Sequence, residues 1–357
     1  MHGMTAYFVR RLLLVPLTFL CITIMVYTIL RIVPGGPVER AKAIVKLKMQ
    51  GEGGAGAARD LGGEQMTDQQ IREIEEYYKV DRSIPAGYAI WLGIYPDAKS
   101  GFSGILQGDF GTSTIFQRSV LHVITGRFRI SLMFGLTGFF LTYLVCIPLG
   151  VVKAIRHKTW IDTASSIAVF FGYATPGFVA CLVLLVVLGG QFNLVPLGGE
   201  KPEKEEWEAL SDAGKVMARL HHALVPLFGY VIGGFATMTV LMKNSLLENL
   251  GQDYVRTAYA KGLSEKRVIF LHALRNSLIP ITAHIGHFLG LLFAGSFLIE
   301  KVCSIEGMGL LGWKAIEARD YPIEMGILVF LVLISLTGNI LSDMIWALID
   351  PRIRFEK

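Results

Sequence analysis

The sequence predicts an all-α membrane protein with six transmembrane helices and a large outer region between the first two. Charged residues make up only 18% of the 357 residues and the mean hydropathy is +0.50, whereas about a quarter of a soluble chain is charged. A helix needs about 20 apolar residues to cross a hydrocarbon core of about 30 Å. Six stretches meet this requirement, at 12–33, 131–152, 163–190, 223–242, 277–299 and 323–349.

The positions of the cationic residues predict the orientation of these helices. The first stretch follows Arg10 and Arg11. Its apolar core is too long for a signal peptide, and no small-residue cleavage site follows it. Lys and Arg are concentrated in four segments, at 1–11, 153–161, 243–275 and 350–357. We therefore expect these segments, and with them both termini, to lie in the cytoplasm. The short loops 191–221 and 300–321 are rich in Glu and Asp and are expected outside.

These boundaries divide the chain into four parts: 1–33 with the first helix, the outer region 34–130, the membrane core 131–349 and the tail 350–357. The outer region opens with "PGGP" and contains a Gly-rich insert at 51–63 with too little apolar content to fold alone. A helix is expected after Thr67, which forms a capping box with Gln70. We expect this region to be a cap without chemistry of its own.

The cytoplasmic segment 243–275 is the most polar part of the membrane core. Apolar residues recur at helical spacing up to Gly262, where a helix would end in a conformation that favours glycine. Ser264 is then expected to cap a second helix that begins at Glu265. Two short helices at a tight corner, surrounded by cations, suit docking into a partner's groove. An interfacial helix lying on anionic lipid fits the same residues, and physical reasoning alone leaves both open.

The stretch "DYVRTAYAKGLSEKRVIFLHALRNSLIP" (253–280) resembles the cytoplasmic EAA loop of ABC-importer permeases in the dipeptide/oligopeptide/nickel family. Arg256, Thr257, Ala258 and Gly262 stand at the Glu-Ala-Ala and Gly positions, so Arg and Thr replace the first two, and the proline is shifted to Pro280. The resemblance continues over most of the chain. Its other fragments are "PGGPVE" (34–39), "GDFGTS" (108–113), "IPLGVVKA" (147–154), "IEGMG" (305–309), "RDYPIEMG" (319–326) and "ALIDPRIRF" (347–355).

The resemblance implies a type I ABC-importer architecture in a bacterial inner membrane, with the outer region in the periplasm. It implies pairing with a second homologous permease, two cytoplasmic ATPase subunits that bind the ATP, and a periplasmic binding protein that delivers peptide. No cofactor in this chain and no nucleic-acid partner are expected. The long outer region and the acidic loop are most similar to the first permease of microcin C-type peptide importers. The residues expected to couple to the ATPases are Tyr254, Arg256, Thr257, Ala258, Lys261, Gly262 and Leu263.

Other chemistry is sparse in the sequence. No GxxxxGK[ST], HExxH or GxSxG pattern occurs, so we expect neither an ATPase nor another enzyme. Asn276, His284 and His287 are candidates for the translocation path, and the two histidines leave a nickel-chelate importer open as an alternative to peptide. Asp343 inside the sixth stretch suits either a structural pair with a cation or the proton relay of a secondary transporter. Of the four cysteines only Cys303 is expected to be exposed, and neither a disulfide nor a metal site is expected.

Overall fold

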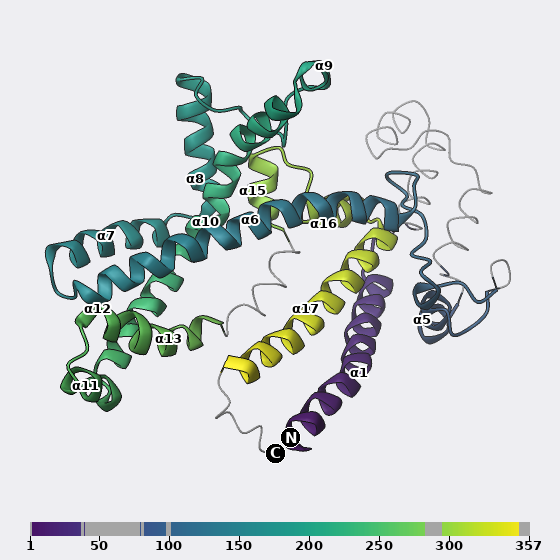
Figure 1. Ribbon diagram of the computed structural model, residues 1–357. Coiled ribbons are helices and arrows are strands. Elements are labelled where there is room, and N and C mark those ends of the chain that lie inside the picture. Colours follow the sequence, from purple (N-terminus) through teal and green to yellow (C-terminus); the bar gives the residue numbers. More distant parts are fainter. Residues whose placement is uncertain are drawn as a thin grey trace. The chain divides into compact units, whose positions relative to one another are not determined.

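The computed structural model describes residues 2–36, 39, 79, 82–97, 101–282 and 295–349. The helix expected after Thr67, the Gly-rich insert, the tail 350–357 and part of the stretch 277–299 lie outside these residues. The chain divides into two compact units, each of which is described by itself. Three long helices have residues in both: α1 (His2–Ile32), α6 (Val120–Ile155) and α17 (Tyr321–Ile349) (Figure 1).

The first unit comprises residues 1–13, 126–311 and 333–357. Apart from parts of the three long helices, it contains α7 (Trp160–Ala174), α8 (Gly177–Leu184), the π-helix η2 (Leu185–Gln191), α9 (Lys204–Ala209), α10 (Asp212–Leu250), α11 (Asp253–Ala260), α12 (Glu265–Arg267), the π-helix η3 (Val268–Ala273), α13 (Leu274–Ser277) and α15 (Phe297–Val302). The helix α16 (Met308–Ala318) begins in this unit.

Helices α8 and α10 pack closely because glycines face each other across the contact. A Cβ atom on Gly177 would lie 2.4 Å from the carbonyl oxygen of Gly229. Small residues of this kind let membrane helices approach backbone to backbone. The surrounding cluster contains Cys181 and Cys303, and Cys303 is only 1% exposed. The expectation that Cys303 is exposed is therefore wrong, because its side chain is buried in the same cluster as Cys181 of α8.

The stretch 163–190, expected to be one span, is interrupted. Helix α7 ends at Ala174, α8 begins at Gly177, and the two axes differ by 95° (Figure 1). Pro176 lacks the N–H that would continue the ladder, and Thr175 before it adopts an extended conformation with ψ of 114°. The apolar length of the stretch predicted helical structure but did not reveal the break between its two helices.

The second unit comprises residues 14–125 and 312–332. It contains α5 (Ile84–Leu92) and the short 3₁₀ turn η1 (Ile105–Gln107), together with parts of α1, α6, α16 and α17. Its core is formed by Tyr27, Tyr88, Leu92 and Met325. Arg31 in the last turn of α1 donates to the carbonyl oxygens of Lys79 and Arg82 at 2.7 and 2.8 Å. The end of α1 is thereby bonded to the chain at Lys79 and Arg82.

Three of the sequence fragments that carry the resemblance meet in the second unit. The buried carboxylate of Asp320 accepts the hydroxyl of Ser113 at 2.6 Å and the N–H of Ile115 at 3.1 Å. The neighbouring Arg319 donates to the carbonyl oxygen of Pro34 at 3.2 Å. "PGGPVE", "GDFGTS" and "RDYPIEMG" therefore form one hydrogen-bonded structure although they are far apart along the chain.

Among the described residues, four helices are long and apolar enough to cross a membrane: α1 from Val9, α6, α10 and α17 up to Met344. The bent pair of α7 with α8 and η2 gives a fifth span if it is counted as one. The expected stretch 277–299 runs into residues 283–294, which the structure does not describe. The expected number of six spans stays a prediction.

Candidate functional site

Segment 243–275, which contains the predicted coupling residues, includes a helix break that sequence periodicity did not reveal. The helical spacing predicted one helix over 243–262, but α10 ends at Leu250 and α11 begins at Asp253. Gly251 and Gln252 form the turn between them, with N–H bonds to Glu248 and Asn249. Because hydrophobic spacing continues across the turn, periodicity joined two helices that the structure separates.

One face of α11 is buried in the first unit. Val255 is 1% and Ala258 is 6% exposed, and both belong to a core cluster with Met242 and Leu246 of α10 and Val268 of η3. We call this group of buried residues the inner cluster; its other members are Val151, Ala154, Ala273 and Ile281. The short helix is thereby packed against the ends of α6, α10 and the following helical segment.

The corner after α11 has the geometry expected of Gly262. Its φ is +77°, a value that side chains other than glycine adopt with strain. The N–H of Gly262 bonds to Tyr259 at 2.9 Å, and that of Leu263 bonds to Ala258 at 3.3 Å. This pair of bonds is the Schellman arrangement, which satisfies the last carbonyl groups of the helix. Leu263 completes it by packing on the inner cluster.

The expected second helix is present with two differences. Ser264 stands at the N-cap of α12, but its hydroxyl makes no capping hydrogen bond. The helix then passes through the π-helical turn η3 before it continues as α13. At its end Ser277 is joined to Ser245 of α10 by two buried hydrogen bonds, at 2.9 and 3.3 Å. The whole segment is therefore fixed to α10 at both of its ends.

The seven predicted coupling residues divide into an exposed group and a packed group. Tyr254, Arg256, Thr257, Lys261 and Gly262 are exposed, whereas Ala258 is buried and Leu263 is half-buried. The cations Lys266 and Arg267 are exposed on the next turn. The segment thus presents a cationic outer face, which we call the docking face, above a packed inner face.

A buried charge cluster near this segment was missed by the sequence reasoning. Lys153 and Lys243 were counted as loop cations, but both lie within helices and contact the carboxylate of Asp162 in α7. The Nζ of Lys243 is 2.7 Å and that of Lys153 is 3.2 Å from Oδ1 of Asp162. Lys153 also donates to the hydroxyls of Ser165 and Ser166, at 3.0 and 2.6 Å. The cluster joins α6, α7 and α10. The sequence feature that could have indicated it is Asp162, an acidic residue at the edge of an apolar stretch.

The expected outer loop 300–321 contains another buried carboxylate, that of Glu300. Glu300 accepts the N–H of Leu310 at 2.7 Å and the hydroxyls of Ser131 and Tyr230, each at 3.2 Å. A Cβ atom on Gly307 would lie 2.4 Å from Glu300 Oε1, so the "IEGMG" fragment needs this glycine to wrap the carboxylate. The pKa of Glu300 is raised above its ordinary value because burial penalises the charged form, and the donors offset this in part.

The other predicted site residues are only partly resolved by the structure. Asn276 is exposed on α13, whereas His284 and His287 lie outside the described residues. Within the described part of the chain no group of three or more His, Cys, Asp or Glu side chains could hold a metal ion. Asp343 forms an ion pair with Arg11. Of the two roles considered for Asp343, this contact agrees with a structural pair with a cation rather than with a proton relay.

Comparison with known proteins identifies the family. The family of binding-protein-dependent transport system inner membrane components matches residues 146–355, which include the whole of segment 243–275. This chain belongs to that family. The match covers α7 to α17, and the charge cluster, the inner cluster and the docking face all lie within the matched residues.

Similar proteins cover the chain from end to end. An inner membrane ABC transporter permease protein, YejB of Escherichia coli O157:H7, is 36% identical over 99% of this chain and 100% of its own length. A peptidoglycan transport system permease protein, YejB of Agrobacterium fabrum, is 32% identical over 99% of both chains. An oligopeptide transport system permease protein, AppB of Bacillus subtilis, is 30% identical over 99% of this chain and 100% of its own. The expected resemblance is confirmed.

Proposed function

We propose that this chain is the permease subunit of an ATP-driven importer that moves peptides across the bacterial inner membrane. The observation that carries the proposal is α11, a helix with one face packed in the inner cluster and the other exposed and cationic. A short helix of this kind suits docking into a groove of another subunit. The family match and the oligopeptide permease among the similar proteins support the choice of reaction and cargo.

The proposed assembly contains four kinds of subunit. A second homologous permease pairs with this chain in the membrane, and two ATPase subunits bind ATP in the cytoplasm, one below each permease. A periplasmic binding protein delivers the peptide. Six spans with both termini in the cytoplasm place the docking face on the ATPase side, in agreement with the distribution of Lys and Arg.

The contacts around α11 suggest how force reaches the membrane helices. A displacement of α11 acts on Met242 and Leu246 of α10 through Val255 and Ala258. The paired bonds between Ser245 and Ser277 make α10 and α13 move together. Packed interfaces transmit such displacements as rigid-body motion, because they do not deform continuously. ATP-driven closure of the ATPases would thus rock the spans between inward-open and outward-open states.

Gly262 allows a direct test of this function. A Cβ atom at this position has no neighbour within 4 Å, but a β-branched residue at positive φ is strained by about 1–2 kcal/mol or more. We expect Gly262→Val to insert normally in the membrane but to lose peptide uptake and co-purification of the ATPase subunits. Gly262→Asn is the matched control, because asparagine tolerates this conformation and retains both activities.

Two results would count against the proposed function. If ATPase subunits never accompany the native chain in mild detergent, the coupling role is wrong. If Gly262→Val takes up peptide as well as the native chain does, the corner after α11 is not part of the machinery.

A further inference from the structure

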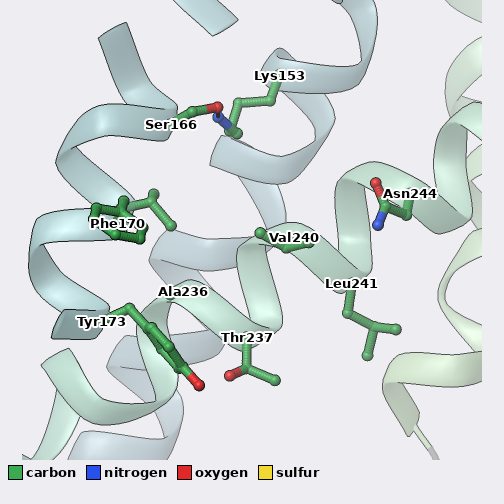
Figure 2. Close-up of a pocket in the computed structure, with 10 residues that line it drawn as sticks. Lys153, Ser166, Phe170, Tyr173, Ala236, Thr237, Val240, Leu241 and Asn244 are labelled. Atoms are coloured by element: carbon green, nitrogen blue, oxygen red, sulfur yellow. Dashed lines mark hydrogen bonds between the residues drawn. The ribbon is translucent and has the colours of Figure 1, made fainter. Parts of the chain in front are cut away.

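Helices α7 and α10 border an open pocket of about 530 Å³ within the first unit. This volume is in the range of about 300–1,000 Å³ that is usual for small-ligand sites. One face of α7 lines it at the spacing of helical turns, with Val169, Phe170 and Tyr173. One face of α10 lines it in the same way, with Thr237, Val240 and Asn244 (Figure 2). We call this pocket the α7–α10 groove.

Three of the polar side chains that line this groove form no hydrogen bond with another described residue. Most threonines in these long helices donate to their own backbone, as Thr239 does to Phe235 at 2.7 Å. Thr237 makes no such bond, and neither the hydroxyl of Tyr173 nor the amide of Asn244 bonds to another described residue. Figure 2 shows the hydroxyls of Tyr173 and Thr237 at one end of the groove. The groove therefore offers hydrogen-bond donors and acceptors among apolar side chains.

The interrupted span lies at the same place. Tyr173 is in the last turn of α7, directly before the break at Thr175 and Pro176. Because Pro176 has no N–H, the carbonyl of Gly172 loses the donor that a continuous helix would give it. At membrane depth, freed backbone groups are tolerated only inside protein or along a water-filled cavity, and broken helices mark binding sites in many transporters.

We propose that the α7–α10 groove contacts the peptide during translocation, with Tyr173, Thr237 and Asn244 bonding to its main chain. This proposal rests on the proposed function and adds to it a surface that neither the sequence motifs nor the family match assigns. Main-chain amides supply both donors and acceptors, which the hydroxyl and carboxamide groups can pair with whatever the peptide's sequence. Phe170 and Val240 would contact the peptide's side chains. Because apolar contacts are non-directional, they would not favour one peptide sequence over another.

A lipid chain is a poorer occupant of the groove than a peptide. An acyl chain satisfies none of the three polar groups, and a polar group without a hydrogen bond in hydrocarbon is destabilised. A peptide satisfies them and also fills the apolar part of the groove. The side chains of Phe170 and Val240, which are 66% and 43% exposed in the single chain, would then be in contact with the cargo.

Uptake kinetics of the complete transporter provide the first test. Each of Thr237→Val and Asn244→Leu removes hydrogen-bonding groups while nearly keeping the side-chain shape. We expect each to raise the KM for a labelled tripeptide about two- to tenfold, the ratio given by the loss of one hydrogen bond. Thr337→Val is the matched control and should leave KM unchanged, since the Thr337 hydroxyl already bonds to Leu333 of its own helix at 2.7 Å.

Cysteine labelling tests whether water and peptide reach the groove. In a chain carrying Cys21→Ser, which removes the exposed native cysteine, Thr237→Cys should react with a water-soluble methanethiosulfonate reagent. Excess tripeptide should slow this reaction. Lack of reaction would overturn the proposal by showing that lipid or the second permease covers the groove. Loss of the second permease when Thr237→Val or Asn244→Leu is purified would also overturn it, because the groove would then be a contact between the two permeases.

The uptake results separate this inference from the proposed function. If the native transporter takes up no peptide at all, both fail. If it takes up peptide and the two groove variants keep the native KM, only the groove assignment fails and the coupling role of α11 stands.

Discussion

The carboxylate of Asp162 joins three helices of the first unit through its contacts with two lysines. The side chain of Lys153 is 2% exposed and that of Lys243 is 15% exposed. Asp162 also accepts the N–H of Lys158 at 3.1 Å and lies 3.1 Å from Nδ1 of His157. Burial of charge is tolerated here because one acid is shared by several donors, and it becomes unfavourable once that acid is removed.

Asp162→Asn should therefore destabilise the folded chain by about 3–5 kcal/mol, because it leaves the buried ammonium group of Lys153 and the partly buried one of Lys243 without a counter-charge. Thermal unfolding of the detergent-purified complex measures this loss. Asp253→Asn is the control, since the Asp253 side chain is 95% exposed in its pair with Arg256, and it should change the free energy of unfolding by less than about 1 kcal/mol. Equal effects of the two substitutions would show that the cluster contributes nothing beyond a surface pair.

At the scale of single elements, the packing of α8 on α10 decides how the interrupted span is held. Prolines 148 and 226 lie inside α6 and α10 without ending them, so a proline alone does not explain the 95° bend at Pro176. The close approach of Gly177 to Gly229 supplies the missing cause, because it fixes the first turn of α8 against α10.

Gly229→Ala tests this packing. Its Cβ atom would lie 2.3 Å from Sγ of Cys181, so α8 must shift, and we expect a loss of about 1–3 kcal/mol in the free energy of unfolding, as for other overpacked sites. Gly233→Ala, one turn later in the same helix, meets nothing within 4 Å and should be neutral or stabilising by up to about 1 kcal/mol. A stability scan of the two variants side by side decides the matter, and similar values for both would contradict the role of Gly229.

The same elements show what the sequence could and could not predict. Apolar length located α1, α6, α10 and α17 because membrane burial depends on composition, and Gly262 revealed its corner because positive φ depends on residue type. The breaks at Gly251 and Pro176 were missed, since apolar spacing continues across both. The pairs of Asp162 with Lys243 and of Ser113 with Asp320 join residues far apart along the chain, and no local pattern specifies such a contact.

At the scale of the whole molecule, the structure separates the surface that would bind an ATPase from the packing that would transmit its motion. Arg256 belongs to the docking face, with a side chain that is 76% exposed. Its neighbour Val255 is 1% exposed and belongs to the inner cluster. Adjacent residues of one short helix should therefore serve the two tasks, and substitutions at them should produce different defects in the assembled transporter.

Arg256→Glu reverses a charge on the docking face and should weaken co-purification of the ATPase subunits while leaving the unfolding temperature of the chain within a few degrees of the native value. Val255→Ala removes two methyl groups from the inner cluster, which costs about 1–3 kcal/mol, and should keep ATPase binding. In that variant ATP hydrolysis should proceed with reduced peptide uptake, because the loosened contact no longer carries the motion of α11 to Met242 and Leu246. Pull-down, ATP hydrolysis and uptake measured on the same preparations distinguish the two defects. If Val255→Ala loses ATPase binding as Arg256→Glu does, binding and transmission are not separable in α11.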